Sequence, residues 1–192
     1  MSRVQRGGFN RSLHPMIESQ FPDAYIGMGM TAENLANRHH ITRQSQEEFA
    51  ASSHHKAISA TKLGLMDDEI VPISGVTTDG CMREPDLEKM SQLSPAFVES
   101  GTVTAATSSP LTDGASALLV CSEEFAINNG LKPLASIVST AVCGVPPEIM
   151  GYGPVPSSEK ALQRAGLTYD DLGVIELSLI HISEPTRLRR IS

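Results

Sequence analysis

The sequence lacks any long apolar run, any closely spaced pair of cysteines and any excess of basic residues. No apolar stretch approaches the roughly 18 residues of a membrane-spanning helix, so we expect no membrane segment. The formal charge of −7 argues against a nucleic-acid partner, because such proteins usually carry a basic face. Cys81, Cys121 and Cys143 form no C-x-x-C motif, and this scattered odd set favours a reducing compartment such as the cytoplasm.

The first hundred residues favour helices and loops. Residues 8–27 show no hydrophobic period and predict a loop, whereas residues 31–39 predict a short helix. Thr42 is a candidate N-cap for a longer helix, and Gly64 is well placed to end it. One helical stripe in this segment is made mostly of small residues, which predicts close packing against another element; it comprises Phe49, Ser53, Ala57, Ala60 and Leu63.

Beyond residue 111 the pattern changes to strands that alternate with helices, which is typical of an α/β sheet protein. We therefore expect a domain boundary near Leu111. The expected strands are residues 69–73, 115–121, 134–145 and 172–177, and the expected helices are 86–93, 123–129 and 157–165.

Several motifs fail to identify a reaction. Gly27-x-Gly29-x-x-Ala32 fits a dinucleotide-binding pattern, but no strand precedes it. The position about 20 residues on, where an acid should end the next strand, falls inside the predicted helix that contains Phe49. Cys121 precedes a helix, yet two glutamates follow it, so a buried structural cysteine is favoured over a nucleophile. Paired histidines at 39–40 and 54–55 cannot face one metal from a helix and suggest solvated helix ends. Residues 101–114 form a loop of small and hydroxyl-bearing residues, which would let a ligand approach the backbone.

Residues at the end of the sequence differ in composition from the rest of the chain. Residues 178–192 bring three arginines, Arg187, Arg189 and Arg190, into an acidic sequence. The stretch LSLIHISEPTR, which starts at Leu177, resembles the translation of a transposase adapter used in sequencing libraries. We therefore expect residues 178–192 to be an artefact, although a basic arm that binds a partner is the alternative.

Seven strings occur in an order and at distances that resemble the thiolase family, most closely the bacterial 3-ketoacyl-CoA thiolases (acetyl-CoA acyltransferases) of fatty-acid β-oxidation. The resemblance covers nearly everything up to Leu177. The strings are GMGMTAEN from Gly27, ITRQSQEEFAASSH from Ile41, DEIVPI from Asp68, SPAF from Ser94, GTVTAATSSPLTDGASALL from Gly101, VCGVPPEIMGYGPVPS from Val142 and ALQRAGLTYDDLGVIEL from Ala161.

The resemblance implies an α/β fold, the five-layer α/β/α/β/α sandwich of thiolases, with a helix- and loop-rich domain inserted in the first half. It implies an internal fragment of that fold. Residues 1–7 would end a first-half segment, 8–111 would be the coenzyme A-binding loop domain, 112–131 would return to the first half, and 132–177 would begin the second.

The resemblance also implies a reaction whose catalytic groups this chain lacks. Thiolases use a nucleophilic cysteine, a histidine of a G-H-P motif and a second cysteine, and none of these motifs occurs in the sequence. We therefore expect the chain itself to be inactive. What the family pattern does place here is a coenzyme A and substrate site, made of Ser109, Met150, Met28, Phe97 and Arg83.

Ser109 matches a serine that hydrogen-bonds the pantetheine arm, and Phe97 an aromatic that faces that arm. Met28 and Met150 match methionines beside the acyl and thioester groups, and Arg83 an arginine near the adenine and phosphate end. Coenzyme A is a substrate, so no cofactor is expected. The parent enzyme would be a homo-oligomer, with a hydratase/dehydrogenase subunit as a possible partner.

Two alternatives stay open at this point. The parent could be a non-catalytic thiolase-like protein that binds coenzyme A or lipid, or it could be a biosynthetic acetyl-CoA acetyltransferase. A V-C-x-S-G segment upstream would mark an enzyme.

Overall fold

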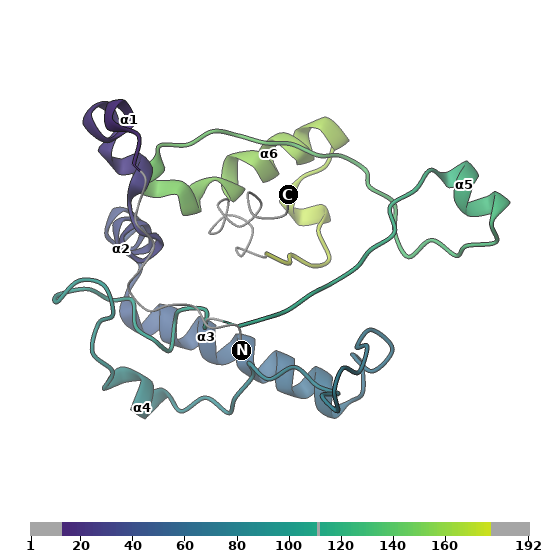
Figure 1. The fold of residues 1–192 in the computed structure, drawn as a ribbon, viewed down its shortest axis with the longest axis horizontal. Coiled ribbons are helices and arrows are strands. Elements are labelled where there is room, and N and C mark those ends of the chain that lie inside the picture. The colour runs from purple at the N-terminus through teal and green to yellow at the C-terminus, as the bar shows by residue number, and fades with distance from the viewer. Residues whose placement is uncertain (1–12, 111, 178–192) are drawn as a thin grey trace. The chain divides into compact units, whose positions relative to one another are not determined.

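The computed structural model describes residues 13–110 and 112–177 (Figure 1). The chain divides into two compact units, Met1–Ala115 and Ser116–Ser192. The first contains helices α1 (Pro15–Gln20), η1 (Pro22–Tyr25), α2 (Met28–Arg38), α3 (Arg43–Lys62) and α4 (Leu87–Ser91). The second contains α5 (Glu123–Asn128), η2 (Pro147–Tyr152), α6 (Pro154–Ala165) and η3 (Tyr169–Asp171).

The long helix α3 begins and ends as predicted. Thr42 is its N-cap, and the Thr42 hydroxyl accepts a hydrogen bond from the Ser45 amide at 3.1 Å. At the other end Gly64 has φ +69°, which glycine adopts without a steric penalty. The amides of Gly64 and Leu65 then reach back to the carbonyls of Thr61 and Ala60, so the last turn is closed by a Schellman motif.

The face of α3 that is buried differs from the predicted stripe. Phe49 is 78% exposed, and Ser53 and Ala57 are also exposed. The covered face instead contains the buried side chains of Glu47 and Ala51. The prediction was wrong because polar contacts decide which face is covered: Arg43, His54 and Thr61 all bond to residues 82–93.

Residues 13–27 are also more ordered than the predicted loop, because two prolines start short helices there. Pro15 is the first residue of α1 and Pro22 the first of η1. Proline suits a first helical position, since its φ is already helical and the missing amide hydrogen would have no partner there. The expected helix at 31–39 is confirmed and begins earlier, at Met28.

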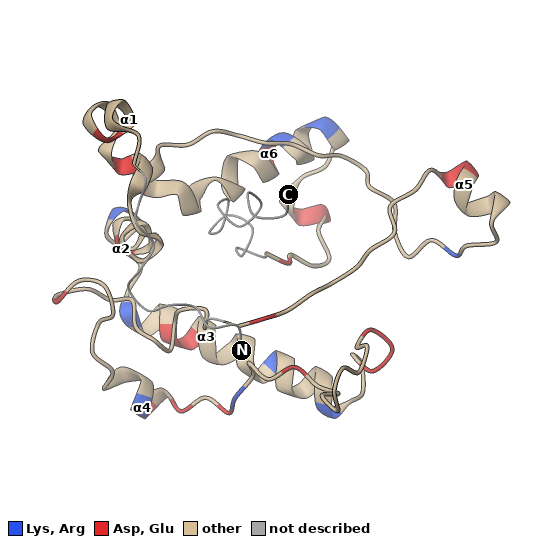
Figure 2. Cartoon of the chain, viewed as in Figure 1, with Lys and Arg blue, Asp and Glu red and all other residues tan. Residues whose placement is uncertain are grey.

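The helices of the second unit follow the sequence closely. Ser122 caps α5 by accepting from the Phe125 amide at 3.1 Å, and Glu123 and Glu124 lie in the first turn. The helix α6 ends at Gly166, which has φ +68°, with Arg164 in its last turn. Figure 2 shows the acidic start of α5 and the basic end of α6, where each charge opposes the helix dipole.

None of the expected strands forms in the described residues. Single bridges, Ile73 with Val76 and Pro95 with Thr104, are the β pairing found in residues 13–110 and 112–177. A strand needs a neighbour for its amides and carbonyls, and no described segment pairs with residues 115–121, 134–145 or 172–177. Their apolar side chains are left open: Leu118, Val142 and Val174 are 82%, 84% and 83% exposed.

The expected domain limits stay predictions. Residues 1–7 and the proposed artefact at 178–192 lie outside the described residues, as does Leu111. The limits at 111/112 and 131/132 stay predictions. In the described part of the chain, no helix is long and apolar enough to cross a membrane.

The unpaired segments predict that the isolated 192-residue chain does not fold cooperatively. Each of the large apolar side chains that stay in water there forfeits about 1.5–3 kcal/mol of burial, whereas a domain is stable by only about 5–15 kcal/mol. Open apolar edges also promote aggregation. We expect an insoluble or molten product with no sharp calorimetric transition, and the same result after removal of residues 178–192. A soluble monomer with a two-state melt and dispersed amide signals would contradict this expectation.

Candidate functional site

The helix α2 holds the start of the hydroxyl-rich loop through one carboxylate. Glu33 is only 4% exposed, and it accepts hydrogen bonds from the amides of Thr102 and Val103 at 2.8–3.0 Å and from the Thr102 hydroxyl at 3.1 Å. Gly101 makes this approach possible, because a methyl group there would overlap the Glu33 carboxylate. The loop is therefore tied to α2 at its first residues.

Three hydroxyls of the loop, those of Thr104, Thr107 and Ser108, bond to the loop itself. The Thr104 side chain is fully buried and accepts from the Ala106 amide at 3.2 Å. The Thr107 hydroxyl accepts from the Thr104 amide at 3.0 Å, and the Ser108 hydroxyl donates to the Thr104 carbonyl at 2.8 Å. Ser109 differs: it is exposed, and no hydrogen bond joins its side chain to another residue within the described ranges. Its hydroxyl is thus open to a ligand.

Phe97 lies on α2 at Gly29. The Ala96 amide donates to the Val103 carbonyl at 2.9 Å, which brings residues 95–97 alongside the loop. A methyl group at Gly29 would overlap the Phe97 ring, so glycine is needed for the ring to lie against the helix. The ring is still 48% exposed, and Met28, the neighbour of Gly29, is 36% exposed. The structure therefore places these two predicted residues at one end of α2.

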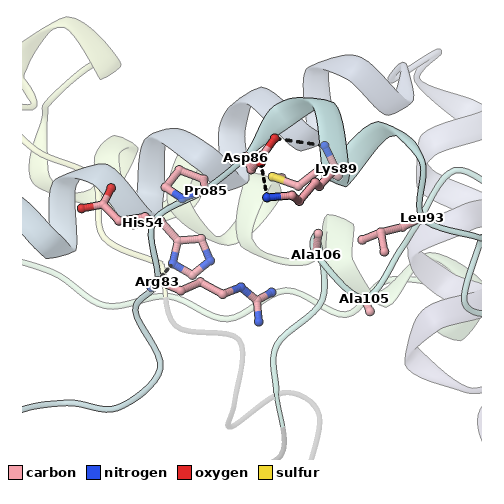
Figure 3. A pocket seen from close by; sticks show the side chains of 10 residues that line it. His54, Arg83, Pro85, Asp86, Lys89, Leu93, Ala105 and Ala106 are labelled. Atoms are coloured by element: carbon pink, nitrogen blue, oxygen red, sulfur yellow. Dashed lines mark hydrogen bonds and ion pairs between the residues drawn. The ribbon is translucent and has the colours of Figure 1, made fainter.

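Arg83 lines a pocket between α3, α4 and the loop (Figure 3). The Arg83 amide donates to Nδ1 of His54 on α3 at 3.3 Å. The Arg83 guanidinium is exposed, and it has no hydrogen bond or ion pair with any described residue. The remaining pocket lining is partly apolar and includes Pro85, Leu93, Ala105 and Ala106. Since Ala105 and Ala106 belong to the loop that leads to Ser109, the structure brings Arg83 close to that loop.

Hydrogen bonds from Arg43 on α3 position α4 beside this pocket. Arg43 on α3 pairs with Glu47 at 2.7 Å, and its guanidinium donates to the carbonyls of Met90 and Leu93 at 2.9 and 2.7 Å. At the start of α4, Asp86 pairs with the Lys89 ammonium at 2.7 Å. The hydrogen bond to Lys89 lowers the pKa of the Asp86 carboxyl, and the same bond raises the pKa of Lys89. Lys89 is thus already partnered, whereas Arg83 is not.

Met150, the remaining predicted site residue, lies in the second unit. It is half-buried in η2, next to the buried Ile149, and its carbonyl accepts from the Gly153 amide at 3.0 Å. The backbone at Ile149 departs from helical angles, with φ −129° and ψ 33°, so the turn is kinked beside Met150. The site roles of all five predicted residues, Met150 included, stay predictions.

The sequence analysis missed Glu33, His54 and Lys89. Their partners lie between 3 and 70 residues away, so helical spacing alone could not reveal the longer contacts. The prediction that both histidine pairs lie at helix ends holds for His39 and His40, which follow α2. It was wrong for His54, which lies inside α3 and serves as an acceptor.

The expected buried state of Cys121 was also wrong. Cys121 is exposed because the segment before it has no strand partner, and Cys81 is exposed as well. Among the described residues, no cluster of three His, Cys, Asp or Glu side chains could hold a metal ion.

Comparison with known proteins identifies the family. The thiolase N-terminal domain matches residues 10–124, and the thiolase C-terminal domain matches residues 131–180. The chain belongs to the thiolase family. It is 47% identical over 176 residues to the 3-ketoacyl-CoA thiolases of Photorhabdus laumondii and Escherichia coli, an alignment that covers 86% of this chain and 45–46% of those thiolases.

A solved structure supports the fold. The Bacillus anthracis acetyl-CoA acetyltransferase matches with a TM-score of 0.73 and 39% identity, covering 79% of this chain and 41% of that chain. This confirms the expected thiolase fold, of which the chain carries a part. The chain spans less than half the length of the thiolases it matches.

The contact between Gly29 and Phe97 predicts a large difference between two neighbouring glycines. In a full-length thiolase that carries this segment, Gly29→Ala forces the ring away from α2. Overpacking of this kind costs about 1–3 kcal/mol, more than the gain of up to about 1 kcal/mol from alanine in a helix. The control is Gly27→Ala: a methyl group at Gly27 meets open space, so its cost is limited to a weaker N-cap of α2. Urea denaturation should show the larger loss of stability for Gly29→Ala; equal midpoints for the two variants would exclude the packing described.

Proposed function

We propose that this chain is the coenzyme A-binding part of a 3-ketoacyl-CoA thiolase of fatty-acid β-oxidation. The observation that carries the proposal is the Arg83 guanidinium, a cation without an ion pair among the described residues, in a pocket that the Ser109 loop also lines. Guanidinium groups bind phosphate oxygens through paired hydrogen bonds, and coenzyme A carries phosphates at one end only. The comparisons support the class of enzyme, since the relatives are named 3-ketoacyl-CoA thiolase.

The three parts of the site suit three parts of the ligand. Arg83 would bind phosphate, while the apolar side chains of Pro85 and Leu93 suit the adenine ring. The Ser109 hydroxyl is open and would hydrogen-bond an amide of the pantetheine arm. Phe97 offers an exposed ring to the same arm, and Met28 would contact the acyl group, where a flexible thioether tolerates varied shapes. For Met150, in the second unit, the thiolase resemblance alone supports a role beside the acyl group.

In the proposed reaction the groups of this chain bind the substrate and the missing segments supply the chemistry. A cysteine thiolate attacks the 3-keto carbon, the bond between C2 and C3 breaks, and the acetyl-CoA carbanion takes a proton from an acid. The acyl-cysteine then transfers its acyl group to the sulfur of a second coenzyme A. Coenzyme A takes part as the substrate's thioester in the first step and as a free thiol, which gives its proton to a base, in the second, so we propose no cofactor. We further propose a cytoplasmic homo-oligomer, able to join a hydratase/dehydrogenase subunit.

Two other functions remain as alternatives. The similarity to the Bacillus anthracis protein, named an acetyl-CoA acetyltransferase, favours a biosynthetic condensing enzyme as the second candidate. Assays of the full-length protein with acetoacetyl-CoA and with long 3-ketoacyl-CoA separate these two, because a β-oxidation thiolase accepts the long chains. A protein that binds coenzyme A with no turnover of either substrate would support the third candidate, a non-catalytic thiolase-like binding protein.

The open hydroxyl of Ser109 predicts a specific loss of affinity. In the full-length enzyme, Ser109→Ala removes one ligand hydrogen bond, worth about 0.5–1.5 kcal/mol, so the KM for coenzyme A should rise by about two- to twelvefold. The matched control is Ser108→Ala, whose hydroxyl bonds to the Thr104 carbonyl within the loop. That variant should lose stability with a smaller change in KM. An unchanged KM together with a lower melting temperature for Ser109→Ala would assign Ser109 a structural role.

The absence of the catalytic motifs predicts that the 192-residue chain by itself has no thiolase activity. Incubation with acetoacetyl-CoA and coenzyme A should give no acetyl-CoA above the rate without protein. Triple substitution of Cys81, Cys121 and Cys143 by serine is the control for stray thiol chemistry. Turnover that this substitution abolishes would show that a cysteine of this chain is the nucleophile, contrary to the proposal.

A further inference from the structure

Glu33 is the most buried carboxylate in the first unit, and its partners all lie in the loop that precedes Ser109. We propose that Glu33 is a positioning residue for coenzyme A: without touching the ligand, its carboxylate sets the places of Ser109 and Phe97. This inference rests on the proposed function, since it assigns to those two residues a ligand that they bind together.

Three donors converge on the Glu33 side chain. Oε1 of Glu33 accepts from the amides of Thr102 and Val103 at 3.0 and 2.8 Å, and Oε2 accepts from the Thr102 amide at 2.9 Å and the Thr102 hydroxyl at 3.1 Å. Both oxygens of Glu33 therefore act as acceptors, and a carboxylate supplies acceptors on both.

The residues that Glu33 holds are connected to both proposed ligand-binding residues, Phe97 and Ser109. The Val103 carbonyl accepts from the Ala96 amide at 2.9 Å, which sets the position of Phe97. In the other direction, the buried Thr104 anchors the turn that ends at Ser108, directly before Ser109. Both residues therefore depend on the same two amides that Glu33 holds.

Gly29 and Glu33 are four residues apart in α2, so they lie on the same helix face. Gly29 receives the Phe97 ring and Glu33 receives the loop amides, one turn apart. A single rigid helix thus sets the spacing between the aromatic and hydroxyl contacts, which a loop alone would leave variable.

Glutamine is a poor replacement for this glutamate. Gln46 on α3 donates to the Thr102 hydroxyl at 2.9 Å, which leaves the single proton of that hydroxyl for its bond to Glu33. A glutamine at position 33 would turn an NH₂ group toward either the Thr102 hydroxyl or the loop amides. In each orientation at least one hydrogen bond is replaced by two donors that face each other.

The test measures steady-state kinetics of the full-length thiolase that carries this segment. With Glu33→Gln, we expect the KM for coenzyme A to rise by about three- to tenfold, the size of one displaced hydrogen bond, while kcat changes by less than about twofold. The control is Thr42→Ala, which removes the cap of α3 and should lower the melting temperature without changing KM. A melting-temperature loss like that of Thr42→Ala with an unchanged KM would overturn the proposal.

A second variant covers the case in which Glu33→Gln does not fold. Thr102→Val keeps both loop amides and removes the hydroxyl, which bonds to Glu33 and accepts from Gln46, so the KM should rise in the same direction by a smaller factor. An unchanged KM in this folded variant also counts against the proposal. Ser109→Ala distinguishes the positioning role of Glu33 from the proposed coenzyme A-binding function. If Ser109→Ala raises the KM and neither Glu33→Gln nor Thr102→Val does, only the positioning role is excluded. If it too leaves KM unchanged, the proposed function fails.

Discussion

The buried carboxylate of Glu33 organises the first unit, because the hydroxyl-rich loop has no sheet to satisfy its backbone. A buried amide without a partner is costly, and two adjacent amides at the start of this loop meet one side chain from α2. The loop then satisfies the rest of its backbone with its own threonine and serine hydroxyls. A segment with little regular structure can in this way hold a defined shape.

The same principle applies to residues 82–93, which lie against α3 through polar contacts. Arg43 reaches two carbonyls near the end of α4, and His54 accepts an amide from Arg83. These bonds explain why the covered face of α3 is polar and why its apolar side chain at Phe49 stays exposed. They also leave the Arg83 guanidinium open beside the loop, which is what a phosphate-binding site requires.

The second unit shows what happens to apolar strands without neighbours. Its helices are well capped and need only local bonds, so α5 and α6 form within a few residues of their expected limits. The segments between them carry strand-like sequences, but their backbone groups need a partner segment that the described residues do not contain. The likeness to a solved thiolase shows that these segments belong to a larger fold, of which this chain spans less than half.

Local features were determined by the sequence alone. The cap at Thr42, the glycine stop at Gly64 and the family resemblance all follow from residues within a few positions or from ordered motifs. The tertiary structure decided which helix face is covered and which hydroxyl is open, because these depend on contacts between residues such as Glu33 and Val103, 70 positions apart. The tertiary structure also decided which segments form strands. A sequence can show that a segment suits a strand, but the strand forms only when a neighbouring segment pairs with its amides and carbonyls.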